Sequence, residues 1–128
     1  MTVWTNTMGA NKEHNLQVIL EGEQGEILIE LIDNEATKEF VAMLPLELEW
    51  SDFAGKEKIA DLPSKLQAKK DLSYIPQVGD FFYYVPWGNI GIFYKQQAPS
   101  DLVYLGKVIS GLERLQKQNF RARISMKK

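Results

Sequence analysis

Short segments in which apolar and polar residues alternate recur along this chain. In residues 46–50, two leucines and a tryptophan alternate with two glutamates, and in residues 120–126 four apolar residues alternate with Arg121, Arg123 and a serine. A period of two places successive side chains on opposite faces of a β-strand, whereas a helix requires apolar residues three and four positions apart. The pattern therefore predicts a mainly β protein whose strands are buried on one face.

Six further segments share this strand character, being short, rich in β-branched or aromatic residues, and bounded by glycine, proline or polar residues. We expect eight strands in all, over residues 16–21, 26–32, 46–50, 57–60, 81–85, 90–95, 103–109 and 120–126. Eight strands close a small barrel whose interior is filled by side chains, and closure removes the exposed edges of an open sheet. The sequence therefore predicts a closed eight-stranded β-barrel.

Two short helices are expected to cover the barrel. The first begins at Asp33 or Asn34, whose side chains can accept hydrogen bonds from free backbone amides, and it ends before Pro45. The second follows Ser110, which forms a capping-box pattern with Glu113, and it runs to about residue 118. The predicted fold class is thus mainly β with two short covering helices.

The length of the chain and its lack of cysteine restrict the possible chemistry. The chain has 128 residues, which fits one compact domain, and it contains no cysteine and one histidine. A disulfide scaffold, a thiolate metal site and a cysteine nucleophile are thereby excluded. We expect residues 1–15 to be a polar, flexible leader, in which His14 is too mobile to act as a base, and residues 16–128 to form the domain. No catalytic residue, metal or cofactor is predicted.

No segment resembles a secretory signal or a membrane span. Residues 1–15 lack an apolar stretch, and the longest apolar run, over residues 81–87, is far shorter than the roughly 20 residues that cross a bilayer. We therefore expect a cytoplasmic protein with no membrane partner.

Acidic and basic residues are distributed unevenly along the chain. The first 64 residues contain 13 Asp and Glu but 4 Lys and Arg, whereas the remaining residues contain 4 acidic and 11 basic side chains. A closed barrel brings its first and last strands together, so we expect Arg121 and Arg123 to lie near Glu21, Glu26 or Glu30. Because such pairing neutralises the basic end of the chain, no nucleic-acid partner is expected.

Several segments resemble a known fold family. Residues 25–40, GEILIELIDNEATKEF, are similar to the second strand and first helix of cyclophilins, and residues 102–115, LVYLGKVISGLERL, are similar to the cyclophilin segment that reads LGKV before a glycine and a short helix. Shorter motifs resemble compact bacterial cyclophilin-like proteins, a largely uncharacterised family: MLPLEL at 43–48, FAGKEK at 53–58, DLP at 61–63, GD at 79–80 and IFYK at 92–95. The resemblance covers residues 16–126 and implies an eight-stranded closed barrel with a helix at each end.

The resemblance does not extend to the isomerase residues of cyclophilins. Active cyclophilins hold the prolyl amide with an arginine in a segment that reads like FHRVI, whereas the corresponding residues 50–62 contain Lys56 and Lys58 but no arginine. Lysine cannot reproduce the planar, forked donor set of arginine. Ile92 stands where the resemblance places the substrate-binding glutamine. These departures favour a binding or accessory module without prolyl isomerase activity, and a divergent peptidyl-prolyl isomerase is the alternative.

Aromatic residues give the clearest indication of a binding site. They cluster in three segments that a barrel brings close together, and alternation cannot bury them all. Core packing explains most of them, and the others are candidates to line a groove for a peptide or a small hydrophobic ligand. The candidate ligand-binding residues are Trp50, Phe53, Tyr84, Trp87 and Tyr94.

Three carboxylates near the fourth strand are a further candidate site. Asp52, Glu57 and Asp61 could gather to bind a hard cation or to act as an acid–base pair. Their spacing matches no known cation-binding loop, so we interpret them as solvated surface carboxylates.

Overall fold

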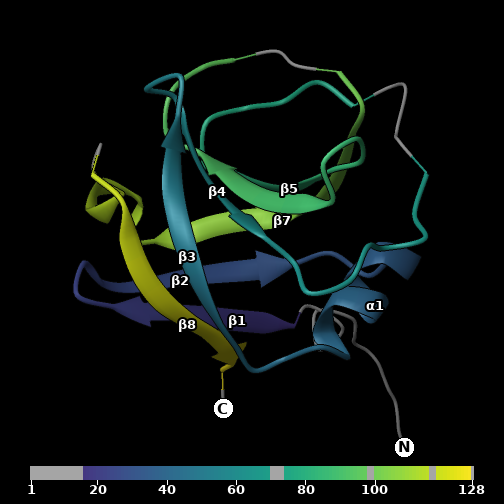
Figure 1. The fold of residues 1–128 in the computed structure, drawn as a ribbon, viewed down its shortest axis with the longest axis horizontal. Coiled ribbons are helices and arrows are strands. Elements are labelled where there is room, and N and C mark those ends of the chain that lie inside the picture. Colours follow the sequence, from purple (N-terminus) through teal and green to yellow (C-terminus); the bar gives the residue numbers. More distant parts are fainter. Residues whose placement is uncertain (1–15, 70–73, 98–99, 116–117, 128) are drawn as a thin grey trace, which may run out of the picture.

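The protein is a closed β-barrel (Figure 1). The computed structural model describes residues 16–69, 74–97, 100–115 and 118–127. The expected leader over residues 1–15, with His14, lies outside the described residues. The eight strands of the described part are β1 (Gln17–Gly22), β2 (Gly25–Leu31), β3 (Leu46–Phe53), β4 (Glu57–Asp61), β5 (Asp80–Tyr84), β6 (Asn89–Phe93), β7 (Leu102–Ser110) and β8 (Phe120–Met126). The predicted mainly β, eight-stranded closed barrel is confirmed.

Strand β8 closes the barrel. Around the barrel the strands follow the order β1-β2-β7-β5-β6-β4-β3-β8, and each neighbouring pair is antiparallel. Ile124 of β8 lies opposite Leu20 of β1 on one side and opposite Leu46 of β3 on the other. The last strand therefore joins the first and third strands, and neither is left with an open edge.

Alternation along each strand divides the side chains between the interior of the barrel and its outer face. On β5, Phe81 and Tyr83 belong to the main core, whereas Phe82 belongs to a second cluster with Phe93 and Leu102. Because successive side chains of a strand point to opposite faces, the second cluster lies on the outside of the barrel. The structure thus has a filled interior and a separate apolar layer over β5, β6 and β7.

The α-helix α1 (Glu35–Val41) lies beside one end of the barrel (Figure 1). Asn34 is its N-cap: the Oδ1 atom accepts a 2.8 Å hydrogen bond from the Thr37 backbone N–H, and the Thr37 Oγ1 accepts one from the Asn34 N–H. The Asn34 Nδ2 donates to the Tyr104 carbonyl on β7, which ties the helix to the barrel.

No helix among the described residues is long and apolar enough to span a membrane.

The second predicted helix is only a three-residue 3-10 turn, η2 (Leu112–Arg114). Ser110 is the last residue of β7, where it pairs with Leu28, so it is not a helix cap. Gly111 occupies the cap position, with a φ of 91° and no side-chain hydrogen bond. The predicted capping box was therefore wrong because the β2–β7 ladder continues through the serine.

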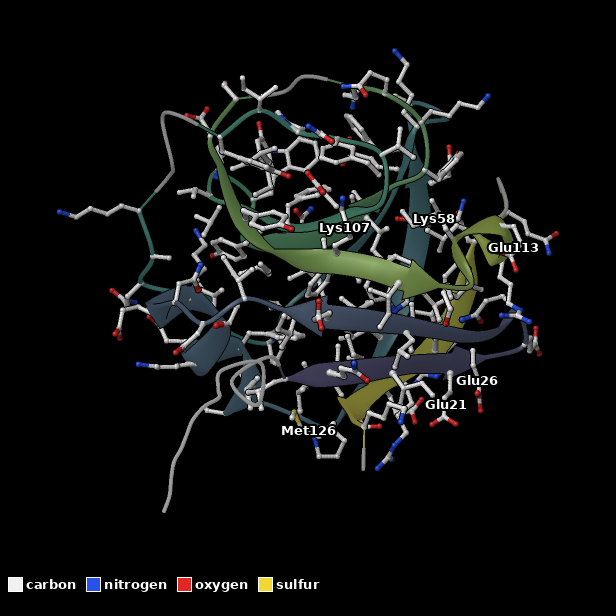
Figure 2. All side chains as sticks on the ribbon, turned by 180° about the vertical axis from the view of Figure 1, so that it is seen from behind. Glu21, Glu26, Lys58, Lys107, Glu113 and Met126 are labelled. Carbon is white, nitrogen blue, oxygen red and sulfur yellow. The ribbon has the colours of Figure 1, made fainter. Side chains whose placement is uncertain are left out.

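Closure also changes the expected partners of the basic last strand. Glu21 does lie opposite Arg123 in the β1–β8 ladder, and it lies opposite Glu26 in the β1–β2 ladder (Figure 2). The ion pairs, however, join β8 to β3: Arg121 Nη1 lies 2.7 Å from Glu49 Oε2, and Arg123 Nη1 lies 4.0 Å from an oxygen of Glu47. The prediction placed the first and last strands together correctly, but it missed β3 as the second neighbour of β8.

Substitution of the helix cap tests how α1 is held. Asn34→Ala removes both the cap and the bond to Tyr104, so we expect it to lower the free energy of unfolding by about 1–2 kcal/mol. Asn34→Asp keeps the capping oxygen and loses only the donor, and it should cost less. Chemical denaturation of the three proteins measures both differences, and equal losses for the two variants would contradict this assignment.

Candidate functional site

The outer face of β4, β5 and β6 contains an apolar pocket with a volume of about 110 Å³. Most of its lining atoms belong to aromatic or aliphatic side chains. We call it the aromatic pocket, and the residues that line it are Phe53, Glu57, Ile59, Phe82, Tyr84, Trp87, Asn89, Gln97 and Leu102. They come from five strands and from the loops that follow β5 and β6.

A glycine in β6 makes room for the pocket floor. The ring of Phe82 stacks on Phe93 with centroids 4.3 Å apart and lies over Gly91. A Cβ atom at Gly91 would lie 2.4 Å from the Phe82 Cζ, closer than real atoms approach. A side chain at position 91 would therefore push the Phe82 ring toward the pocket. Glycine at this position lets the ring lie flat on β6 as the floor of the pocket.

Three aromatic rings form the rim of the pocket. Trp87 meets Phe53 at an interplanar angle of 85° and Tyr84 at 84°, with ring centroids 5.7 and 5.4 Å away. Trp87 is 55% exposed and Phe53 is 40% exposed, which is unusual for residues of this size and apolarity. The rim thus presents large apolar surfaces to the solvent at the mouth of a pocket.

Polar groups interrupt this apolar lining at two points. Glu57 is only 6% exposed, and its Oε2 accepts a 2.6 Å hydrogen bond from Gln97 Nε2. Asn89 is 2% exposed, and its buried Oδ1 has no hydrogen-bond partner among the described residues. Glu57 pairs with Phe93 and Asn89 with Asp61 in the same β4–β6 ladder, so the two acceptors lie at different points along it.

Burial raises the pKa of Glu57 above its ordinary value, and the nearby negative charge of Asp52 raises it further. The hydrogen bond from Gln97 acts in the opposite direction but does not cancel these effects. Because the folded state disfavours the ionised carboxyl, the free energy of unfolding falls as the pH rises through the pKa of Glu57. The charge of Glu57 therefore does not stabilise the fold.

The neighbouring carboxylate, Asp52, has a different environment. Its Oδ1 lies 2.9 Å from the Nζ of Lys58, a side chain with no exposed surface, and it also accepts a hydrogen bond from the Tyr94 hydroxyl. Burial alone would raise the pKa of Asp52, but hydrogen bonds from Tyr94, Lys58 and Gly55 together with the lysine charge bring it below 3.8. Burial and the Asp52 carboxylate raise the pKa of Tyr94 to about 12. We call Asp52, Lys58 and Tyr94 the ionic cluster.

The structure brings together three of the five predicted ligand-binding residues. Phe53, Tyr84 and Trp87 line the aromatic pocket. Trp50 does not, because it is fully buried in the barrel core, where it stacks on Phe120 at 6.2 Å. Tyr94 belongs to the ionic cluster, where its ring lies 5.1 Å from the Lys58 Nζ.

Sequence reasoning missed the polar residues of the pocket. Asp52, Glu57 and Asp61 do not gather into one group, and Glu57 is buried, so its interpretation as a solvated surface carboxylate was wrong. A signal was present: Glu57 and Ile59 are two positions apart on one strand and must share a face. No signal pointed to Gln97, which reaches Glu57 from a loop.

No side chain in the described part of the pocket lining resembles the cyclophilin arginine. Neither arginine nor lysine occurs among the described residues that line the pocket. Lys58 is completely buried and bonded to Asp52, so it does not face the pocket (its position is labelled in Figure 2). Ile92, at the position compared with the cyclophilin glutamine, is fully buried in the barrel core.

The ionic cluster predicts a specific pH dependence of stability. Asp52→Asn leaves the Lys58 charge buried without a counter-ion, so we expect a loss of about 3 kcal/mol in the free energy of unfolding at pH 7. Because the pKa of Asp52 is lower in the folded state, the stabilisation that its charge provides is complete above pH 3.8 and is lost as the pH falls further. Denaturation at several pH values should therefore show the difference from the original protein narrowing in acid.

Glu49→Gln is the matched control for this measurement. Glu49 also forms a 2.7 Å ion pair, but its side chain is 70% exposed, so its loss should change the free energy of unfolding by less than about 1 kcal/mol. Equal effects of the two substitutions would contradict a special role for the buried pair.

Comparison with known proteins identifies the fold. The sequence model described as the Cyclophilin-like family matches residues 20–125. The solution structure of a hypothetical protein from Archaeoglobus fulgidus superposes with a TM-score of 0.72 at 15% identity, covering 89% of this chain and 96% of that one. No curated protein matches the sequence. At this identity the structural likeness shows the fold alone, and the family match over most of the chain shows that the protein belongs to the Cyclophilin-like family.

Proposed function

We propose that this protein is a binding module that holds a peptide side chain or another small, largely apolar group in the aromatic pocket, and that it does not catalyse prolyl isomerisation. One observation carries the proposal: Trp87, Phe53 and Tyr84 meet at the mouth of a pocket on the outer face of the barrel. Concave sites lined by aromatic rings with a few polar groups are typical ligand sites.

The size of the pocket limits what it can hold. A cavity of 110 Å³ is smaller than an engineered cavity of about 150 Å³ that binds benzene. It accommodates the end of one side chain or a small molecule of a few heavy atoms. A longer ligand would place the rest of its length against the exposed rings of Trp87 and Phe53.

The lining also argues against the alternative, a divergent peptidyl-prolyl isomerase. Rotation about a prolyl amide is favoured by a donor that holds the substrate carbonyl, and the described lining provides neither arginine nor lysine for this purpose. The arginines of the described residues are engaged elsewhere: Arg114 donates to the Glu26 carbonyl, and Arg121 and Arg123 pair with glutamates of β3.

Binding can be tested by following the indole N–H signals of the tryptophans in NMR spectra during titration with small aromatic and aliphatic fragments. We expect ligands of the pocket to shift the Trp87 signal and to leave that of Trp50 in place, because Trp50 is enclosed in the core. Trp87→Ala should weaken binding at least tenfold, which corresponds to about 1.4 kcal/mol; because this variant lacks the indole signal, its binding is followed through the backbone amide signals of Phe82 and Tyr84, which line the pocket.

Ile109→Ser provides the control for the loss of an exposed apolar side chain. Ile109 is 46% exposed but does not line the pocket, so this variant should bind as the original protein does. If no fragment shifts Trp87, or if both variants weaken binding equally, the proposed binding function is wrong.

A peptide assay tests the absence of isomerase activity. The cis-to-trans conversion of a prolyl peptide takes tens to hundreds of seconds without a catalyst, and we expect this rate to be unchanged by the protein. A rate that rises in proportion to protein concentration, and that Trp87→Ala abolishes, would establish the isomerase alternative.

A further inference from the structure

The polar groups inside the aromatic pocket have features that an apolar ligand does not explain. Neither a small hydrocarbon nor an aromatic ring can bond to the Glu57 carboxyl or to the Asn89 Oδ1. Both side chains are more than nine-tenths buried. The Asn89 Oδ1 is a buried acceptor without a donor among the described residues, which is unfavourable, so this pocket is better matched to a ligand that carries N–H groups.

Glu57 has no cationic partner among the residues that the structure describes. None of the ion pairs formed by the described residues includes it, and its one hydrogen bond comes from the neutral amide of Gln97. Buried carboxylates are ordinarily paired with a cation or bound to a metal. No group of three or more side chains that could hold a metal ion occurs among the described residues. An organic cation that enters from outside would supply the missing partner.

The aromatic rim favours the same class of ligand. Trp87 stands nearly perpendicular to both Phe53 and Tyr84, so faces of these rings point in different directions around the mouth of the pocket. The electron-rich face of an indole attracts an ammonium group, and this attraction strengthens when water is excluded. An anion, by contrast, would be repelled by Glu57.

From these observations we infer that the aromatic pocket binds a primary alkylammonium group, whose N–H donors bond to the Glu57 carboxylate and whose alkyl chain packs against Phe82 and Ile59. The volume of 110 Å³ suits a short chain of this kind. The same chemistry occurs in a free alkylamine and at the end of a lysine side chain. This inference rests on the proposed binding function and specifies its ligand class.

Three probes of equal length test the preference for an ammonium group separately from the proposed binding function. n-Butylammonium, 1-butanol and butyrate should be titrated at pH 8, with the Trp87 indole signal as the readout. We expect n-butylammonium to bind at least tenfold more tightly than 1-butanol and butyrate not to bind. Equal affinities for the ammonium and the alcohol would overturn the inference and leave the binding function intact, whereas binding of none of the probes or fragments would overturn both.

Glu57→Gln tests the role of the carboxylate. The glutamine keeps the size of the side chain and an oxygen for Gln97, and it should lower the affinity for n-butylammonium at least tenfold without changing that for 1-butanol. Since the charge of Glu57 opposes folding, the variant should be at least as stable as the original protein at pH 8. Glu49→Gln, which removes an exposed carboxylate of β3, should leave both affinities unchanged.

A lysine-containing peptide distinguishes the two sources of the ammonium group. Nα-acetyl-lysine methylamide should be compared with the same compound acetylated on Nε. Binding of the first but not the second identifies a protein or peptide lysine as a ligand. Binding of n-butylammonium with no binding of either lysine compound identifies a free amine, and a preference for the acetylated form would contradict the inference.

Discussion

Pairing of β8 with both β1 and β3 is the interaction on which the rest of the structure depends. The two ladders enclose Ile124 between Leu20 and Leu46 and complete the ring of strands. Without them, β1 and β3 would each present an unpaired edge, and the interior side chains would lose a wall. The ion pairs between β8 and β3 are exposed and contribute little energy, but they favour the observed register over one shifted by a single residue.

A filled barrel leaves only its outer surface for ligands, and that surface is divided in chemical character. Over β3 and β8 it is charged, as the pair of Arg121 and Glu49 illustrates. Over β5 and β6 it is apolar, because Phe82 and Phe93 stack there instead of in the core. Gly91 allows these rings to lie flat on the strand. The aromatic pocket thus forms because β5 and β6 have apolar residues at their outward positions as well as at their inward positions.

Alternation is sufficient to predict the strands and the closed barrel, since both depend on local pattern and on the number of strands. It also separates Trp50 from Phe53, which are three positions apart on β3 and therefore face opposite sides; grouping them in one groove ignored this constraint. Alternation could not predict contacts between segments that are distant in the sequence. Ser110 has a capping pattern but is held by a strand 82 positions earlier at Leu28, and the bond of Gln97 to Glu57 spans 40 positions.

Asp52 and Glu57 show how two carboxylates on adjacent strands can have opposite roles. Asp52 pairs across the β3–β4 ladder with Lys58, whereas Glu57 pairs with Phe53. The first is therefore held beside a buried cation and has a lowered pKa; the second lies among aromatic rings and has a raised pKa. The ion pair with Lys58 balances the charge of Asp52 within the fold itself. Nothing within the described fold does the same for Glu57, and a cation bound in the pocket would lower its pKa.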